Sequence, residues 1–167
     1  VEGSRRVPGW VYSDPSIYAR EQERIFGGRS WNYVGLTSEI PRSGDFLQTY
    51  VGENPVVVVR DQAGKIRVFV NRCTHRGSQF CVEPRGHADS FICPYHQWTF
   101  DLEGSLKAVP FRRGIGGKGG MSDGFDPAQH GLEQLTVAER HGVVFASYAK
   151  DIEPLKTYLA PTILSYF

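Results

Sequence analysis

The chain has 167 residues, of which 40% are hydrophobic and 22% charged, and its formal net charge is +1. This length suits a single domain with a substantial core, and the composition is that of an ordinary globular protein. The balanced charge argues against a nucleic-acid partner. The longest apolar runs, such as residues 56–59, are too short to span a membrane.

A helix is predicted over residues 13–28. Its first turn has a capping residue, Ser13 or Asp14, and Pro15 fits that turn because its missing N–H needs no partner there. Two glycines at 27–28 can end the helix. The sequence therefore predicts one helix before any strand.

Short runs rich in β-branched and aromatic residues follow the helix, with turn-forming residues between them. The runs lie at 31–36, 46–51, 56–60, 66–71, 90–93, 98–102 and 135–148. Short strands at this spacing favour an antiparallel sandwich or barrel over a parallel sheet. The expected fold class is mainly β, an antiparallel β-sandwich with the helix before it. A short helical tail from Glu153, interrupted at Pro161, should follow the strands.

Two stretches in the middle of the chain each place a cysteine beside a histidine. The first, CTHRGSQF, contains Cys73 and His75, and the second, CPYHQWTF, contains Cys93 and His96. Cysteine sulfur and imidazole nitrogen bind zinc and iron–sulfur clusters in proteins. The sequence therefore predicts one metal centre that takes ligands from both stretches.

Both stretches share a local plan. Each follows directly on a predicted strand, and each contains a residue that eases a turn, Gly77 in the first and Pro94 in the second. Two cluster-binding loops at the tips of adjacent hairpins can therefore face each other across a metal.

The order of the ligands distinguishes zinc from a binuclear iron centre. Structural zinc sites with two cysteines and two histidines usually keep like ligands together in the sequence. Here each loop supplies one of each, which suits a centre in which one iron takes both sulfurs and the other both imidazoles. That is the ligand pattern of a Rieske [2Fe–2S] cluster. A zinc-stabilised interaction module is the remote alternative.

The sequence resembles the Rieske domain of the large (α) subunits of aromatic-ring-hydroxylating oxygenases. The likeness extends from SWNYVGLTSEIPRSGDF before the ligands to HGLEQLTVAERHGVVFASY and PTILSYF after them. It is greatest toward the branch of salicylate 5-hydroxylase, anthranilate dioxygenase and terephthalate dioxygenase. The resemblance implies that Cys73 and Cys93 bind one iron of the cluster and that His75 and His96 bind the other.

The resemblance also implies a function and partners. In such enzymes the domain passes electrons from a ferredoxin or an NAD(P)H-dependent reductase to a mononuclear Fe(II), where an aromatic ring is hydroxylated with O2. The α subunits form trimers, with or without β subunits. The implied activity is that of an oxidoreductase, a mono- or dioxygenase, and the implied substrate is an aromatic carboxylate of the benzoate or salicylate type.

The catalytic iron of that family lies in a C-terminal domain. The remaining histidines, His87, His130 and His141, form no two-histidine, one-carboxylate pattern, so we expect no catalytic residue in this sequence. Its apolar ending suggests a piece of a longer chain. Three regions are expected: a helix and lead-in strand over 1–40, the cluster domain over 41–148, and the start of a linker over 149–167. A free-standing Rieske ferredoxin is the alternative, but it would leave the first helix and the apolar tail unexplained.

Other positions separate this motif from that of respiratory Rieske proteins. Those proteins resemble it but have a further cysteine in each loop, joined in a disulfide, where this sequence has Ser78 and Tyr95. Their serine and tyrosine hydroxyls, which bond to cluster and ligand sulfur, are replaced here by Trp98 and Phe100. Cys81 has no partner, and we expect it to be a small buried apolar side chain. So few cysteines also suggest a reducing, cytoplasmic compartment.

Overall fold

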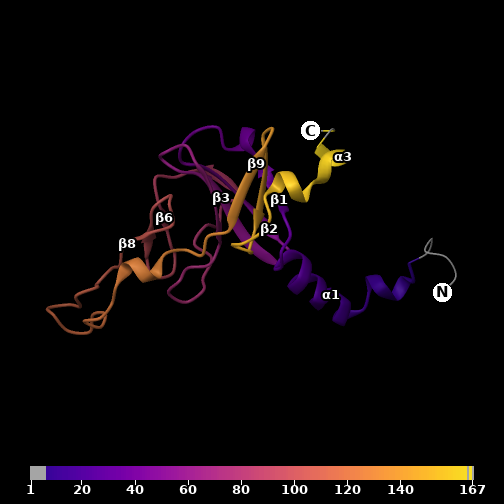
Figure 1. Ribbon diagram of the computed structural model, residues 1–167. Coiled ribbons are helices and arrows are strands. Elements are labelled where there is room, and N and C mark those ends of the chain that lie inside the picture. The colour runs from indigo at the N-terminus through magenta and orange to yellow at the C-terminus, as the bar shows by residue number, and fades with distance from the viewer. Residues whose placement is uncertain (1–6, 165, 167) are drawn as a thin grey trace.

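The computed structural model describes residues 7–164 and 166 as three antiparallel sheets with short helices near both ends (Figure 1). The strands are β1 (Asn32–Leu36), β2 (Asp45–Val51), β3 (Asn54–Arg60), β4 (Ile66–Val70), β5 (Arg85–His87), β6 (Phe91–Ile92), β7 (Thr99–Phe100), β8 (Leu106–Ala108), β9 (Thr136–Arg140) and β10 (Val143–Ser147). The helical elements are η1 (Gly9–Tyr12), α1 (Pro15–Glu21), η2 (Gln22–Phe26), η3 (Thr37–Glu39), η4 (Pro127–His130), α2 (Leu155–Tyr158) and α3 (Ala160–Leu164). The predicted class, mainly β and antiparallel, is confirmed.

The four-stranded sheet, in the order β4-β3-β2-β5, is the centre of the fold. Successive side chains of a strand point to opposite faces, so the valine run at 56–59 serves two cores. Its even-numbered members pack with Val34 and Val144 of the sheet β1-β10-β9. Its odd-numbered members pack with Phe91 and Phe100 of the small sheet β6-β7-β8. Burial on both faces explains why this strand reads as an unbroken apolar run.

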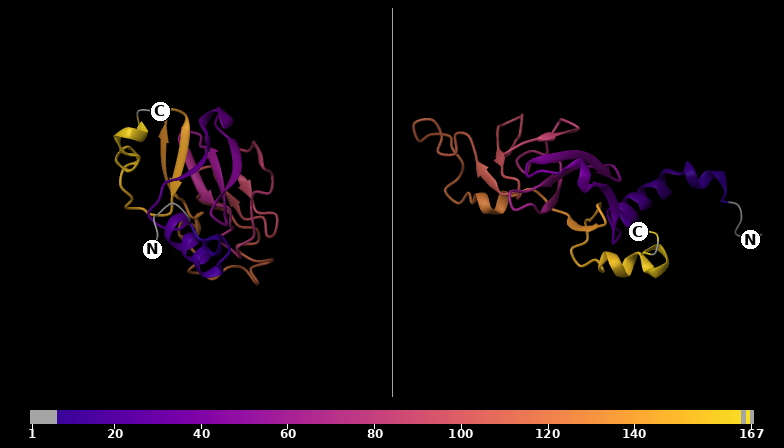
Figure 2. Two further views of the ribbon diagram at one scale, coloured as in Figure 1. Left: turned by 90° about the vertical axis from the view of Figure 1, so that its right-hand side faces the viewer. Right: turned by 90° about the horizontal axis from the view of Figure 1, so that it is seen from above.

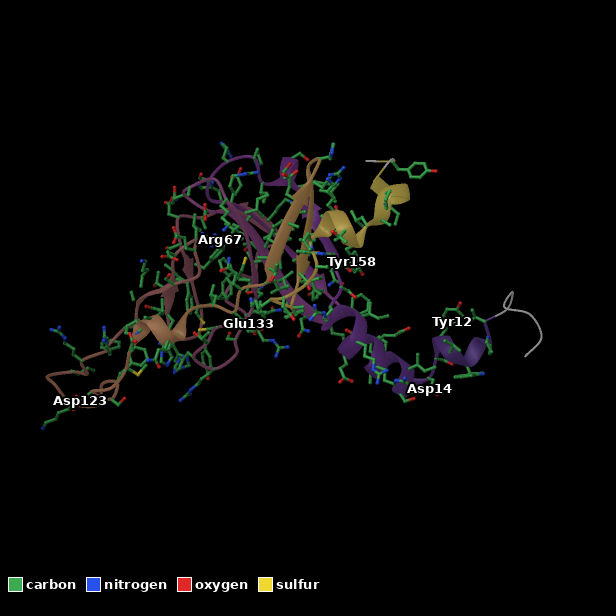
Figure 3. All side chains as sticks on the ribbon, viewed as in Figure 1. Tyr12, Asp14, Arg67, Asp123, Glu133 and Tyr158 are labelled. Atoms are coloured by element: carbon green, nitrogen blue, oxygen red, sulfur yellow. The ribbon has the colours of Figure 1, made fainter. Side chains whose placement is uncertain are left out.

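The predicted N-terminal helix is present as α1 followed by the short π-helix η2, at the opposite end of the molecule from β8 (Figure 2). Of the two candidate caps, Asp14 is the one used, and its side chain accepts bonds from the N–H groups of Ser16 and Ile17 (Figure 3). The helix lies against the turn between β2 and β3, because Tyr18 Oη donates to Glu53 Oε1 at 2.8 Å.

The predicted C-terminal tail is also helical and interrupted. It consists of α2 and α3, and Ala160, the residue before Pro161, has a φ of 56° at the break. Proline disfavours the helical conformation in the residue that precedes it, which explains the interruption. Within the described part of the chain, no helix is both long enough and apolar enough to cross a membrane.

The two loops that carry the Cys-His pairs differ in how their ends are held. The second loop is a hairpin tip, since β6 and β7 on either side of it pair with each other. The first loop lies between β4 and β5, which occupy opposite edges of the four-stranded sheet. The expectation of two adjacent hairpins is therefore wrong for the first loop, because β5 pairs with β2 instead of β4.

Inside the loops, the backbone makes the same turn twice. In each loop the cysteine carbonyl accepts a hydrogen bond from the N–H of the fourth residue after it, and the cysteine N–H donates to the carbonyl of the fifth. These two residues are Gly77 and Ser78 for Cys73, and Gln97 and Trp98 for Cys93. Gly77 and Gln97 occupy equivalent left-handed positions, with φ of 73° and 59°. The sequence indicated Pro94 as the residue that eases the second turn, whereas the unusual backbone conformation belongs to Gln97.

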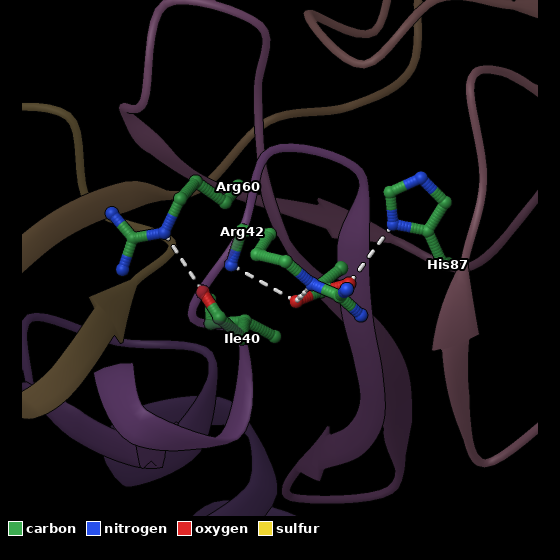
Figure 4. Close-up of polar contacts among 5 residues, drawn as sticks. Ile40, Arg42, Arg60 and His87 are labelled. Atoms are coloured by element: carbon green, nitrogen blue, oxygen red, sulfur yellow. Dashed lines mark hydrogen bonds and ion pairs between the residues drawn. The ribbon is translucent and has the colours of Figure 1, made fainter.

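A buried carboxylate fixes β5, the strand that connects the first loop to the second. Asp45 is 6% exposed, and its Oδ1 lies 2.9 Å from Nδ1 of His87 on β5 (Figure 4). Because a carboxylate only accepts, Nδ1 of His87 must carry the proton. Oδ2 accepts from the N–H of Arg42 at 2.9 Å. The hydrogen bond from His87 is the largest cause that holds the pKa of Asp45 below its ordinary value of 3.8, and the bond from the Arg42 N–H is the next.

Asp45→Asn should remove a pH-dependent part of the stability. A carboxyl whose pKa is lowered by folding stabilises the fold fully above its unfolded pKa, and this contribution is lost as the pH falls through the lowered value. The difference in unfolding free energy between wild type and Asp45→Asn should therefore be constant above about pH 5 and shrink below it. Urea titrations between pH 7 and pH 3 measure this difference. A difference that does not change down to pH 3 would contradict the role given to Asp45.

Exchanging the residues at the two left-handed positions should change stability in opposite directions. A residue with a side chain costs about 1–2 kcal/mol there relative to glycine, partly offset by the flexibility of unfolded glycine. A Cβ at Gly77 would meet no atom within 4 Å, so only the backbone cost applies. Gly77→Gln should lower the unfolding free energy by about 1 kcal/mol, and Gln97→Gly should leave it unchanged or raise it by up to about 1 kcal/mol. Denaturant titrations check both, and a loss of stability in Gln97→Gly would count against the equivalence.

Candidate metal centre

The structure brings together the four side chains that the sequence analysis singled out. The thiols of Cys73 and Cys93 lie within hydrogen-bonding reach of each other. The rings of His75 and His96 have centroids 4.5 Å apart and planes at 68°. Among the described residues, no three His, Cys, Asp or Glu side chains converge on one point. The arrangement is a thiol pair beside an imidazole pair.

The two pairs have different surroundings. Cys73 and Cys93 are 3% and 1% exposed and belong to the core cluster that contains Phe80, Phe91 and Phe100. Both histidines are only partly buried. The sulfur side of the site therefore faces the apolar interior, and the imidazole side faces the surface.

Burial governs the chemistry of the Cys73 thiol. Burial is the largest cause that raises the pKa of Cys73 to about 11, and the neighbouring Cys93 thiol adds to it. The backbone N–H groups of His75 and Arg76 act in the opposite direction by hydrogen bonding to the sulfur. A thiol of this kind keeps its proton at neutral pH unless a metal replaces it. The two N–H groups are placed to stabilise the sulfur charge once that happens.

His75 has the properties of a neutral ligand. Burial, followed by the nearby His96 and Arg76, lowers its pKa. Its Nδ1 is buried and has no hydrogen-bond partner among the described residues. Buried polar nitrogens are normally paired, so an unpaired one calls for an explanation, and a bound metal provides it. The donor set thus fits a binuclear centre with two sulfur and two imidazole ligands.

Trp98 holds the His75 ring from one side. The two rings are stacked, with centroids 4.7 Å apart and planes at 6°. Phe125 and His130 meet the indole edge-on, at 5.8 and 5.9 Å. Thr74 Oγ1, in the first loop, donates to the carbonyl of His130 at 2.7 Å. The segment around η4 therefore fixes Trp98 and, through it, His75, a role that the sequence analysis missed.

A surface cleft of about 380 Å³ opens beside the imidazole pair. His75, His96 and Tyr95 line one side of it, and residues of the loop between β8 and η4 line the other. Tyr95 packs on His96 with centroids 3.9 Å apart and is 62% exposed. The imidazole side of the site can therefore be reached from solvent.

The remaining cysteine and histidines make other contacts and are not members of the two pairs. Cys81 is a buried side chain, as predicted, and burial raises its pKa to about 11. His87 bonds to Asp45, as described above, and His130 Nδ1 lies 2.9 Å from the Asp126 carbonyl. His141 forms the tight turn between β9 and β10.

Comparisons with known proteins agree with this geometry. The chain is 52% identical over 170 residues to the large oxygenase component of salicylate 5-hydroxylase from Ralstonia sp., covering 99% of this chain and 40% of that protein. It is 54% identical over 158 residues to the large subunit of anthranilate 1,2-dioxygenase from Burkholderia cepacia, covering 95% and 37%. The solved structure of naphthalene 1,2-dioxygenase from Rhodococcus sp. matches with a TM-score of 0.85 and 34% identity, covering 96% and 35%. The chain thus spans about two fifths of the length of these relatives.

A family model of the Rieske [2Fe–2S] domain matches residues 30–118, which is more than half of the chain and includes both Cys-His loops. The chain belongs to the Rieske [2Fe–2S] domain family.

Proposed function

We propose that Cys73 and Cys93 bind one iron of a [2Fe–2S] cluster and that His75 and His96 bind the other. The observation that supports this most directly is the separation of the four donors into a buried thiol pair and an outer imidazole pair. One zinc ion with the same four ligands would need all of them around a single point. Such a cluster supplies reversible one-electron transfer.

The charges of the cluster and its ligands suit one-electron transfer. Two thiolates, two sulfides and two ferric ions sum to zero, and neutral imidazoles add nothing. One-electron reduction then changes the net charge only to −1, which limits the cost of charge in a partly buried site. The partly exposed histidine edge provides the route by which an electron enters or leaves.

We infer that the chain is the electron-transfer domain of a ring-hydroxylating oxygenase α subunit. Electrons from a ferredoxin or an NAD(P)H-dependent reductase would pass through it to a mononuclear iron outside the described residues, where an aromatic carboxylate is hydroxylated with O2. The relatives named for salicylate and anthranilate support this substrate class, since both compounds are benzoates. A free-standing ferredoxin is the alternative, and the length of the parent chain separates the two.

The position of α2 relative to the histidine edge is consistent with an acceptor on another subunit. The loop that carries Asp123 borders the cleft beside the histidines, and α2 with Tyr158 lies at the other side of the molecule (Figure 3). A catalytic domain joined to the chain after α3 would therefore begin on the side away from the imidazole edge. A trimer of α subunits, with or without β subunits, would place the histidine edge of one copy against the iron site of its neighbour.

The metal and sulfide content of the protein tests the cluster assignment. The purified chain should contain two irons and two acid-labile sulfides, and Cys73→Ser or Cys93→Ser should abolish the cluster because serine replaces a sulfur ligand. Cys81→Ser is the matched control: this cysteine is also buried, but its thiol donates to the Glu83 carbonyl, so the variant should keep the full iron and sulfide content. Iron, zinc and sulfide assays test this. One zinc and no sulfide per chain would refute the cluster.

The residues at positions 98 and 100 predict a low reduction potential for the cluster. A hydroxyl that donates to cluster or ligand sulfur stabilises the reduced, more negative state, and Trp98 and Phe100 stand where respiratory Rieske proteins have two such hydroxyls. Each bond is worth about 1–2 kcal/mol with a sulfur acceptor, and about 1.4 kcal/mol equals roughly 59 mV for one electron. Two absent bonds therefore lower the midpoint by on the order of 100 mV. We place the midpoint near the low end of the range of Rieske centres, at roughly −150 to −100 mV.

Redox titration of variants tests whether the two absent hydroxyl bonds lower the midpoint. Trp98→Ser with Phe100→Tyr should raise the midpoint if the cluster is retained. Because Trp98 also supports the His75 ring, Phe100→Tyr alone is the gentler variant and should give a smaller rise. A wild-type midpoint above about +100 mV, or no rise in a double variant with an intact cluster, would contradict the explanation.

A further inference from the structure

The first ligand loop needs a closure that strand pairing does not give it. The second loop is closed by the ladder in which Phe91 pairs with Phe100 and Ile92 with Thr99. The strands that flank the first loop, β4 and β5, are separated by β3 and β2. Some other interaction must bring the two ends of the first loop together.

The Asn71 side chain makes that interaction. Asn71 follows directly on β4, is 0% exposed, and its own N–H donates to the Pro55 carbonyl at 2.8 Å. Its Nδ2 donates to the Cys81 carbonyl at 2.7 Å, and its Oδ1 accepts from the Cys81 N–H at 3.0 Å. This is the exchange of two hydrogen bonds that joins directly opposed residues in an antiparallel sheet. The side-chain amide takes the place of a peptide group.

The remaining capacity of the amide is used as well. Oδ1 also accepts from the Phe80 N–H at 3.2 Å, and Nδ2 also donates to Gln48 Oε1 at 3.3 Å. Both donors and both lone pairs of the amide are therefore satisfied. Phe80, held in this way, packs its ring 5.2 Å from that of Phe91 and joins the core around the cysteines. Without the amide, two buried N–H groups would lose their acceptor, which is costly.

We propose that Asn71 is a positioning residue for the cluster: its side-chain amide closes the first ligand loop and so holds Cys73 and His75 opposite Cys93 and His96. This inference rests on the cluster assignment made above. Asparagine is the suitable residue because leucine has the size without the hydrogen bonds, and aspartate lacks the two donors.

Asn71→Leu in the full-length, cluster-loaded protein tests the proposal. Asp61→Leu is the matched control, since Asp61 is also 0% exposed and closes a different turn, by accepting from the Lys65 N–H and from Arg67. The cluster of Asn71→Leu should be lost about tenfold faster or more, by visible circular dichroism, at a temperature where both variants remain folded by far-ultraviolet dichroism. The g values of its reduced cluster should shift, and those of Asp61→Leu should not. Wild-type g values, with cluster loss no faster than in Asp61→Leu, would overturn the proposal.

If Asn71→Leu does not take up the cluster, hydrogen exchange of the wild-type holoprotein tests whether the Asn71 amide closes the first loop. The amide of Cys81 should exchange about 100-fold more slowly than that of Gln79, which lies exposed in the same loop. Equally fast exchange of the two amides in a sample that contains two irons and two sulfides would overturn the role of Asn71 but not the cluster assignment. A wild-type sample without iron and sulfide would overturn the proposed function, and this role with it.

Discussion

The burial of two cysteine sulfurs side by side is the constraint on which the rest of the site depends. A thiolate is expensive in an apolar core, and a second one beside it is more so, which is why burial raises the pKa of Cys73 to about 11. A cationic metal centre removes both difficulties by replacing the two protons. The proposed ligation of the second iron by neutral imidazoles then keeps the oxidised site uncharged. The cost of charge thus accounts for placing the sulfurs inside and the histidines at the surface.

The central sheet makes this placement possible. With the valines of β3 buried on both faces, the sheet supports one core that contains the cysteines and a second core that contains β1 and β10. The loops come from different sheets, so each needs its own closure. The second has the β6–β7 ladder, and we propose that the first has the Asn71 amide in its place. The same turn inside both loops then gives the two cysteines equivalent backbone settings.

Local features of the sequence predicted the helix, the longer strands and the four grouped side chains. Cys73 and His75 lie two residues apart, within a single turn, so their pairing is visible in the sequence. The burial of residues 56–59 is visible because all four are valine. Features that depend on distant partners could not be predicted. β5 has exposed side chains and no apolar pattern, and only its pairing with β2 and the Asp45–His87 bond make it a strand. Gln97 gives no sign of its left-handed backbone, which the tertiary structure imposes. The role of Asn71 depends on a backbone group ten residues away.

Electron transfer by this domain requires the mixed ligation of one binuclear centre by the two loops. Pulsed electron paramagnetic resonance of the reduced protein, prepared with isotope-labelled histidine, tests it directly. Two imidazole nitrogens should couple to the unpaired spin, and both couplings should change with the label, while β-proton couplings of two cysteines remain. A reduced cluster without histidine nitrogen couplings, or with only one, would contradict the ligation by His75 and His96.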